Sequence, residues 1–290
     1  MIRDSLKRLA RPVPTPVRRR WRRRVLRANR RRLAKRRDWI VGPPDFVGVG
    51  AQRAGTNWWW RLLCDHPDVH ATGAKELHFF DAFFGREFSE DDVHAYHRLF
   101  PRPKGCLVGE WTPRYMHDFW TPPLLKRAAP DTRILVLLRD PLQRYRSGVT
   151  YERDALKHAV RRRRRQYVAA MDANDALSRS LYARPIRTLL DHFDRSQVLV
   201  LQYERCVEDP ASQLRRTYEF LGLGNVEHMP ASVRERRGGS SPPVHITDAA
   251  TEAARRVVLR DVQELKALVP EIDLDLWPSC PDDGPGPRER

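Results

Sequence analysis

The segment "GAQRAGTN" (50–57) has the residue types and spacing of a phosphate-binding loop. Gly50 and Gly55 are spaced like the glycines of an ATP-binding G-x-x-x-x-G-K-[ST] loop, but Thr56 occupies the lysine position. The cation of this segment is instead Arg53, inside the turn. Backbone N–H groups at a glycine turn and at a helix start bind anions. The segment predicts an anion site, and the alternative is an ordinary strand–turn–helix connection capped by a threonine.

A second segment, "LLRDPLQRYRSG" (137–148), places another cation after an apolar run. Arg139 ends that run, and Ser147 follows eight residues later. If a helix starts at Pro141, the serine lies about two turns into it, because a helical turn takes about 3.6 residues. Both side chains then reach one phosphate group of a ligand. The alternative is a surface arginine and a solvent-facing helical serine.

A third segment, "AKELHFFD" (74–81), brings three ionisable side chains together: Glu76, His78 and Asp81. A carboxylate beside aromatic side chains is a candidate general base. The alternative is a salt-bridged surface turn in which His78 is structural.

Short apolar runs alternate with helical patterns along the chain, and this alternation must position the three segments. The expected strands cover residues 46–49, 106–110, 133–138 and 197–204. The expected helices cover residues 56–65, 142–153, 211–223 and about 248–268, with helical periodicity also over 176–194. This pattern predicts an α/β, three-layer P-loop-like fold with a central parallel sheet flanked by helices. Ligands in such folds bind at the carboxyl ends of the strands, where the candidate residues stand.

Charge divides the chain into a basic arm (1–40), one domain (41–278) and a short flexible tail (279–290). Residues 1–39 carry 17 of the 54 lysine and arginine residues but only 2 of the 37 acidic residues. The arm is either a partly disordered, solvated tail or an amphipathic helix on an anionic membrane surface, and nucleic-acid binding is less favoured. It has no apolar run long enough for a transmembrane helix or a secretory signal.

The cysteine pattern predicts neither a zinc site nor a disulfide framework. The four cysteines are widely spaced and form no C-x-x-C pair. We expect reduced thiols, no metal, and a cytoplasmic protein that is peripheral at the membrane if the arm binds there.

In matching order from Phe46 to Leu223, the chain resembles the sulfotransferases that use 3′-phosphoadenosine 5′-phosphosulfate (PAPS), nearest the branch of heparan sulfate 3-O-sulfotransferases and N-sulfotransferases. The segments that carry the resemblance are "FVGVGAQRAGT", "HPDV", "KELHFFD", "GEWTPRYM", "RILVLLRDPLQRYRSGV", "SLYARPI", "VLVLQYERCVEDP" and "FLGL".

The resemblance implies a role for each candidate residue. The 5′-phosphosulfate would be held by the loop residues Arg53, Ala54, Gly55, Thr56 and Asn57. The 3′-phosphate would be bound by Arg139 and Ser147. Glu76 matches the catalytic base, and Arg53 would stabilise the departing 3′-phosphoadenosine 5′-phosphate. The late loop "RRGGSS" (236–241) would close over the donor through Arg237 and Gly238. His78 and Asp81 match residues that line the acceptor side.

Two positions depart from the family pattern. Arg53 stands where relatives have a loop lysine, and it keeps the charge but is larger. Trp111 stands where the 3-O-sulfotransferases have an active-site lysine before Thr-Pro. Trp111 lacks that charge, and we expect it to contact the acceptor by stacking on a sugar ring.

The acceptor is expected to be a hydroxyl or amine of a glycan or glycolipid. The run of five arginines within "HAVRRRRRQY" (158–167) would attract an anionic acceptor, or is a solvated loop. Two other readings stay open: a P-loop nucleotide kinase or NTPase, and a non-catalytic protein that binds anions or nucleic acid.

Overall fold

The computed structural model describes residues 38–71, 75–161, 173–224, 227–235 and 242–280, with the backbone alone for 155–161 and 173–174. Several predictions from the sequence lie outside these ranges. They concern most of the basic arm, most of the arginine run, Arg237 and Gly238, and the end of the tail. Their roles stay predictions.

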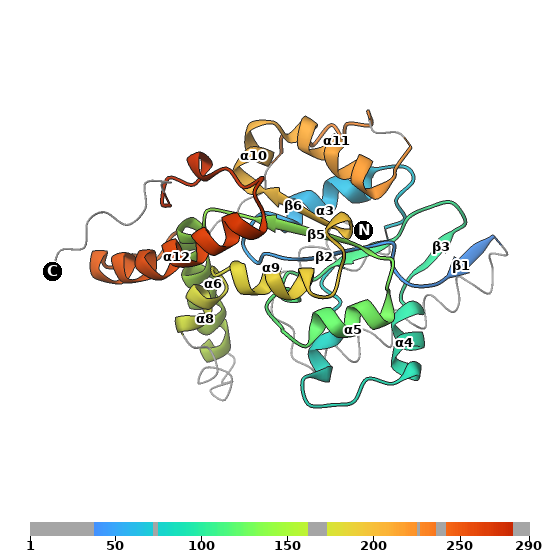
Figure 1. Cartoon of the computed structure of the whole chain (residues 1–290), viewed down its shortest axis with the longest axis horizontal. Coiled ribbons are helices and arrows are strands. Elements are labelled where there is room, and N and C mark those ends of the chain that lie inside the picture. Colours follow the sequence, from blue (N-terminus) through green and yellow to red (C-terminus); the bar gives the residue numbers. More distant parts are fainter. Residues whose placement is uncertain (1–37, 72–74, 162–172, 225–226, 236–241, 281–290) are drawn as a thin grey trace.

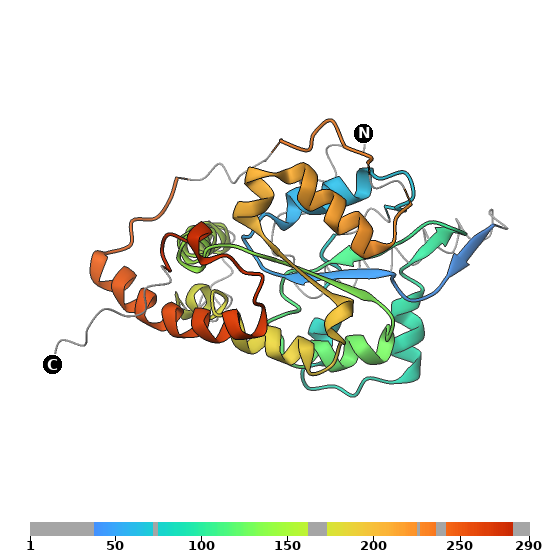
Figure 2. The same ribbon diagram turned by 45° about the horizontal axis from the view of Figure 1, so that its top comes forward.

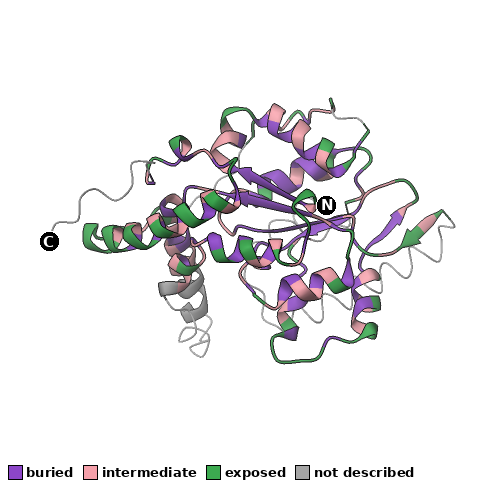
Figure 3. Ribbon diagram, in the orientation of Figure 1, coloured by how far each residue is buried: buried purple, intermediate pink, exposed green. Residues whose placement is uncertain are grey.

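A parallel four-stranded sheet forms the centre of the molecule, in the order β4-β2-β5-β6. Its strands are β2 (Phe46–Gly50), β4 (Gly109–Trp111), β5 (Arg133–Leu138) and β6 (Val198–Gln202). Nearly every residue of these strands is buried, as the colouring of Figure 3 shows. Strands covered on both faces need continuous apolar runs, which is why these segments were recognisable in the sequence.

Helices cover both faces of this sheet, which confirms the predicted three-layer α/β class. Figures 1 and 2 place α3 (Thr56–Asp65), α10 (Tyr203–Glu208) and α11 (Pro210–Leu221) on one face. On the other face lie α5 (Thr121–Ala128) and α9 (Ala183–Leu190). The remaining helical elements are η1 (Phe80–Phe83), α4 (Glu90–His97), α6 (Pro141–Arg161), α8 (Ala173–Ser178), η2 (Arg195–Gln197), α12 (Asp248–Leu268) and η3 (Leu274–Leu276). Within the described part of the chain, no helix combines the length and the apolar character needed to cross a lipid bilayer.

The two ends of the described chain are more ordered than the sequence predicts. Strand β1 (Trp39–Val41) pairs with β3 (Pro101–Pro103) in a small antiparallel sheet, so two residues assigned to the arm belong to the folded part. At the other end, the Ser279 amide donates to an Asp140 carboxylate oxygen at 3.2 Å, and Cys280 is fully buried. Ser279 and Cys280, which the sequence predicts to be part of the flexible tail, therefore belong to the folded part.

Strand β2 carries glycine where the neighbouring strand places a tryptophan. The Trp111 indole lies over Gly48, so that a Cβ at position 48 would come within 2.0 Å of the ring. Its Nε1 donates to the Gly50 carbonyl oxygen at 3.2 Å, and the side chain has no exposed surface. The prediction that Trp111 stacks on an acceptor sugar is therefore wrong: this ring belongs to the core.

We expect Gly48→Ala to destabilise the protein by about 1–3 kcal/mol or more, because the added methyl overpacks a site closed by a buried indole. Gly85→Ala is the matched control, since a Cβ there meets no heavy atom within 4 Å. Urea unfolding of both variants measures the difference. Equal unfolding free energies would contradict the packing described for Trp111.

Candidate active site

The turn between β2 and α3 presents a helix start suited to an anion. Gly55 precedes α3 with a φ of +88°, and a Cβ there would lie 2.7 Å from the Tyr203 ring. Both the backbone conformation and the available space therefore require glycine. Among the described residues, no side chain caps this helix, and its first turn holds no acidic residue. The N–H groups of that turn and the positive end of the helix dipole favour a bound anion.

The two predicted phosphate-binding segments meet at Arg53. Its Nε donates to the Ser147 hydroxyl at 3.1 Å, and its guanidinium lies 5.4 Å from the centre of the Tyr151 ring. Arg139 Nη1 lies 3.5 Å from the Arg53 carbonyl oxygen and its guanidinium faces the Tyr203 ring. Burial and the nearby Arg139 charge lower the pKa of Arg53. The structure thus brings Arg53, Arg139 and Ser147 together, as one anion would require.

A buried arginine that sequence reasoning missed holds this loop in place. Arg144 has no exposed surface, and its Nε donates to the Gln52 carbonyl oxygen at 3.0 Å. Its Nη1 donates to the Ala176 carbonyl oxygen at 2.5 Å and to the Ser180 hydroxyl at 3.1 Å. Burial lowers the pKa of Arg144 to about 10. The sequence indicated this role only through position, because Arg144 falls on the side of the predicted helix that faces the core.

The predicted base segment forms a chain of carboxylate, imidazole and carboxylate. His78 Nδ1 lies 3.0 Å from Asp81 Oδ2, and His78 Nε2 lies 3.3 Å from Glu76 Oε2. The Glu76 side chain is 40% exposed, whereas the His78 and Asp81 side chains are mostly covered. Partial desolvation raises the pKa of Glu76, but the His78 hydrogen bond and the Lys75 charge outweigh it and lower the pKa to about 2. Glu76 is therefore an ionised carboxylate at the surface of the site.

Lys75 connects this base segment to the anion loop, and sequence reasoning did not single it out. Its ammonium lies 3.4 Å from the Thr56 hydroxyl and 3.3 Å from Glu76 Oε1. The side chain is only 13% exposed, and burial lowers its pKa. The place of Lys75 beside Glu76 was visible in the sequence, but its contact with Thr56 depends on the tertiary fold.

A buried polar network behind β4 supports the base segment. Glu110 has no exposed surface; the hydroxyls of Tyr96 and Thr112 donate to its carboxylate, each at 2.7 Å. Burial raises the pKa of Glu110. The Thr112 hydroxyl also accepts the His78 amide at 3.4 Å, and the Trp111 carbonyl oxygen accepts the Glu76 amide at 3.1 Å. The network thus fixes the backbone that carries Glu76 and His78.

Three of the candidate site residues have left-handed backbone conformations. Among the described residues other than glycine, a positive φ occurs at Arg53 (70°), Glu76 (63°) and His78 (50°). Such conformations cost energy in residues with a Cβ and are found at functional sites. All three had been selected from the sequence for their chemistry, so the backbone geometry is independent support for the site.

The other predicted loop residues differ in exposure. Ala54 and Thr56 are buried, and Asn57 is exposed on the first turn of α3. Trp111 contributes its carbonyl oxygen to the site and not its ring.

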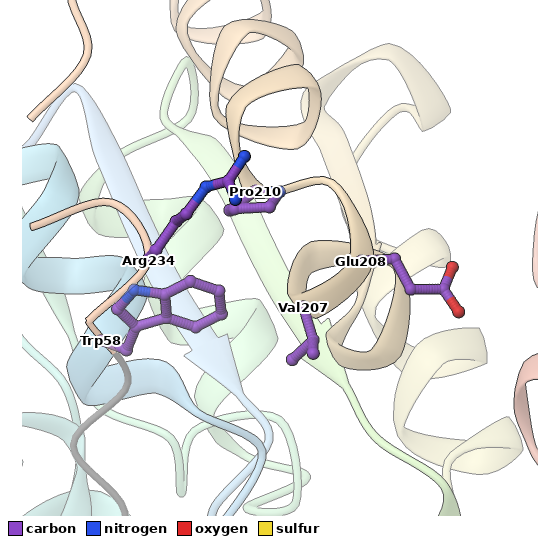
Figure 4. Close-up of a pocket in the computed structure, with 5 residues that line it drawn as sticks. All are labelled: Trp58, Val207, Glu208, Pro210 and Arg234. Atoms are coloured by element: carbon purple, nitrogen blue, oxygen red, sulfur yellow. The ribbon is translucent and has the colours of Figure 1, made fainter.

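A shallow pocket lies beside the first turn of α3. Figure 4 shows Trp58 and Arg234 on one side of it and the end of α10 on the other, with the Glu208 carboxylate directed away from the indole. The lining residues are Trp58, Val207, Glu208, Pro210 and Arg234. Trp58 Nε1 donates to the Val233 carbonyl oxygen at 3.1 Å, which fixes the ring.

Comparison with known proteins agrees with this geometry. The family described as "Sulfotransferase domain" matches residues 43–236. A 189-residue stretch is 32% identical to mouse heparan sulfate glucosamine 3-O-sulfotransferase 3B1, covering 63% of this chain and 47% of that protein. The human 3B1 protein is 30% identical with the same coverage. This chain therefore spans about half the length of these curated relatives.

A solved structure supports the same relationship. The crystal structure of a sulfotransferase from Alicyclobacillus acidocaldarius has 28% sequence identity and a TM-score of 0.62. The match covers 82% of this chain and 99% of the bacterial one.

We expect His78→Ala to raise the pKa of Glu76 above about 2, because it removes the largest interaction that lowers it. A carboxyl group whose pKa is lowered on folding stabilises the folded state at pH values above its unfolded pKa of 4.5. This stabilisation is lost as the pH falls toward the folded pKa of about 2. Carbon-13 NMR titration of the Glu76 carboxyl measures the change, with the exposed His245→Ala as control. An unchanged Glu76 titration in His78→Ala would contradict the coupling.

Proposed function

Because this chain belongs to the sulfotransferase domain family, we propose that it transfers the sulfuryl group of PAPS to a hydroxyl group of a glycan. The observation that carries the proposal is the Lys75 ammonium, which contacts both Thr56 in the anion loop and the carboxylate of Glu76. A donor bound at the loop and an acceptor beside Glu76 would meet at this point.

The residues divide the donor between them. The start of α3 and Thr56 would hold the 5′-phosphosulfate, and Arg139 and Ser147 would hold the 3′-phosphate. We place the guanidinium of Arg53 at the 3′-phosphate as well, and not at the 5′-phosphosulfate as expected from the sequence. The hydrogen bond from Arg53 to Ser147 supports placing Arg53 beside the residues that would bind the 3′-phosphate. In the pocket beside the buried Trp58, the exposed guanidinium of Arg234 is the group on which an adenine ring would stack.

In the transfer itself, the acceptor oxygen would bond to sulfur as the bond from sulfur to the 5′-phosphate oxygen breaks. The electron pair of that bond passes to the leaving 3′-phosphoadenosine 5′-phosphate, and the acceptor proton passes to Glu76. Sulfuryl transfer resembles phosphoryl transfer, in which positioning and electrostatic stabilisation supply the rate. His78 and Asp81 would hold the carboxylate in position toward the acceptor.

The acceptor class rests on the relatives, whose names specify a glucosamine of heparan sulfate. We propose a glycan hydroxyl and use heparan sulfate as the first probe.

We expect Glu76→Gln to lower kcat for transfer from radiolabelled PAPS to heparan sulfate by about 10²–10⁴-fold, because the amide cannot accept the proton. The affinity for 3′-phosphoadenosine 5′-phosphate, measured by calorimetry, should not fall, because Glu76 contributes no group to the donor. Glu252→Gln on the exposed face of α12 is the matched control. Full activity of Glu76→Gln would remove this residue from the mechanism.

We expect Ser147→Ala to weaken binding of 3′-phosphoadenosine 5′-phosphate by about tenfold, since it removes a hydroxyl at the 3′-phosphate and the hydrogen bond that orients Arg53. Adenosine 5′-phosphate, which lacks the 3′-phosphate, should bind the variant and the wild type equally. Calorimetry without metal measures both ligands. Wild-type protein that binds ATP with magnesium but not the bisphosphate would support a nucleotide kinase instead.

A further inference from the structure

The anion loop and the base segment need a cation between them, and the loop arginine is directed elsewhere. The Arg53 guanidinium contacts Ser147 and faces Tyr151, on the side of α6. Trp111, where the family resemblance implies a lysine, is a buried indole. Neither side chain supplies positive charge beside Glu76.

Lys75 fills that place. Its ammonium is within 3.4 Å of the Thr56 hydroxyl on one side and 3.3 Å of the Glu76 carboxylate on the other. An ammonium has three N–H donors, and these are its two hydrogen-bond partners among the described residues. The mostly covered side chain makes the charge strong at short range, because the surrounding dielectric is lower than that of water.

We propose that Lys75 binds the 5′ end of the donor and acts as the cation of the transfer step. This inference rests on the proposed function. As the bond between sulfur and the 5′-phosphate oxygen breaks, the electron pair stays on that oxygen, and the ammonium stabilises the resulting charge while keeping its own proton.

The same contact couples the donor to the base. In the structure, the Lys75 ammonium pairs with Glu76 and helps to keep the pKa of this carboxyl low, together with His78, which Asp81 holds from behind. When the Lys75 ammonium turns from Glu76 to an anionic donor, the ionised form of Glu76 loses part of its stabilisation and its pKa rises. Glu76 then becomes a stronger base only when a donor is in place.

A purely structural ion pair would have a different consequence. It would hold the segment 75–78 against the loop, and its loss would weaken every ligand of the site alike. A ligand that lacks the 5′-phosphate distinguishes the two possibilities: its affinity should fall only if Lys75 has a structural role.

The experiment compares the full chain with Lys75→Met, in which length is kept and charge removed, and with Lys75→Arg, in which charge is kept. Lys75→Gln is a second neutral variant, and Lys104→Met on an exposed turn is the matched control. Calorimetry measures binding of 3′-phosphoadenosine 5′-phosphate and of adenosine 3′-phosphate, and thermal melting without ligand checks the fold.

We expect Lys75→Met and Lys75→Gln to bind the bisphosphate about tenfold or more weakly than wild type, as for loss of a charge-assisted hydrogen bond, with adenosine 3′-phosphate unchanged. Lys75→Arg should recover most of the loss, and Lys104→Met should match wild type. Unchanged bisphosphate affinity, or equal losses for both ligands, would overturn the assignment of Lys75. Wild-type protein that does not bind the bisphosphate would instead contradict the proposed function.

Discussion

The site depends on holding like charges close together at the start of one helix. Arg53 belongs to the turn between β2 and α3, Arg139 lies within hydrogen-bonding distance of the Arg53 carbonyl oxygen, and Lys75 lies within hydrogen-bonding distance of Thr56 at the start of α3. Arg53 and Arg139 repel each other, and the Arg139 charge contributes, after burial, to the lowered pKa of Arg53. The arrangement persists because rigid supports oppose the repulsion. The buried guanidinium of Arg144 fixes the Gln52 carbonyl, and the Tyr203 ring closes the space beside Gly55.

The base segment is held by a second buried group, which is a carboxylate where the loop is held by a guanidinium. Glu76 is exposed, but its amide and that of His78 are held by the strand end at Trp111 and Thr112. Thr112 in turn is fixed by the buried carboxylate of Glu110. Buried polar groups are costly unless they are satisfied, so this network constrains the backbone strongly. It explains how Glu76 and His78, both of which have a Cβ, keep left-handed conformations.

Trp111 illustrates how the type of a residue decides whether it acts in the core or at the site. A lysine at the end of β4 would have to extend from the sheet toward the ligand, whereas the indole turns inward over Gly48 and fills the core. The space that the indole needs exists because β2 has no side chain at position 48. The apolar ring therefore strengthens the sheet beneath the site, while charge beside Glu76 comes from Lys75 in another segment.

The sequence by itself determined the α/β class, the strands β2, β5 and β6, and the three segments that form the site, because apolar periodicity and glycine turns are local properties of the chain. It did not determine where side chains point. The direction of Arg53, the contact of Lys75 with Thr56, the burial of Trp111 and the anchoring of Ser279 each depend on residues distant in sequence. Only the tertiary structure decided these, since packing and charge select a side-chain direction from partners that no local pattern contains.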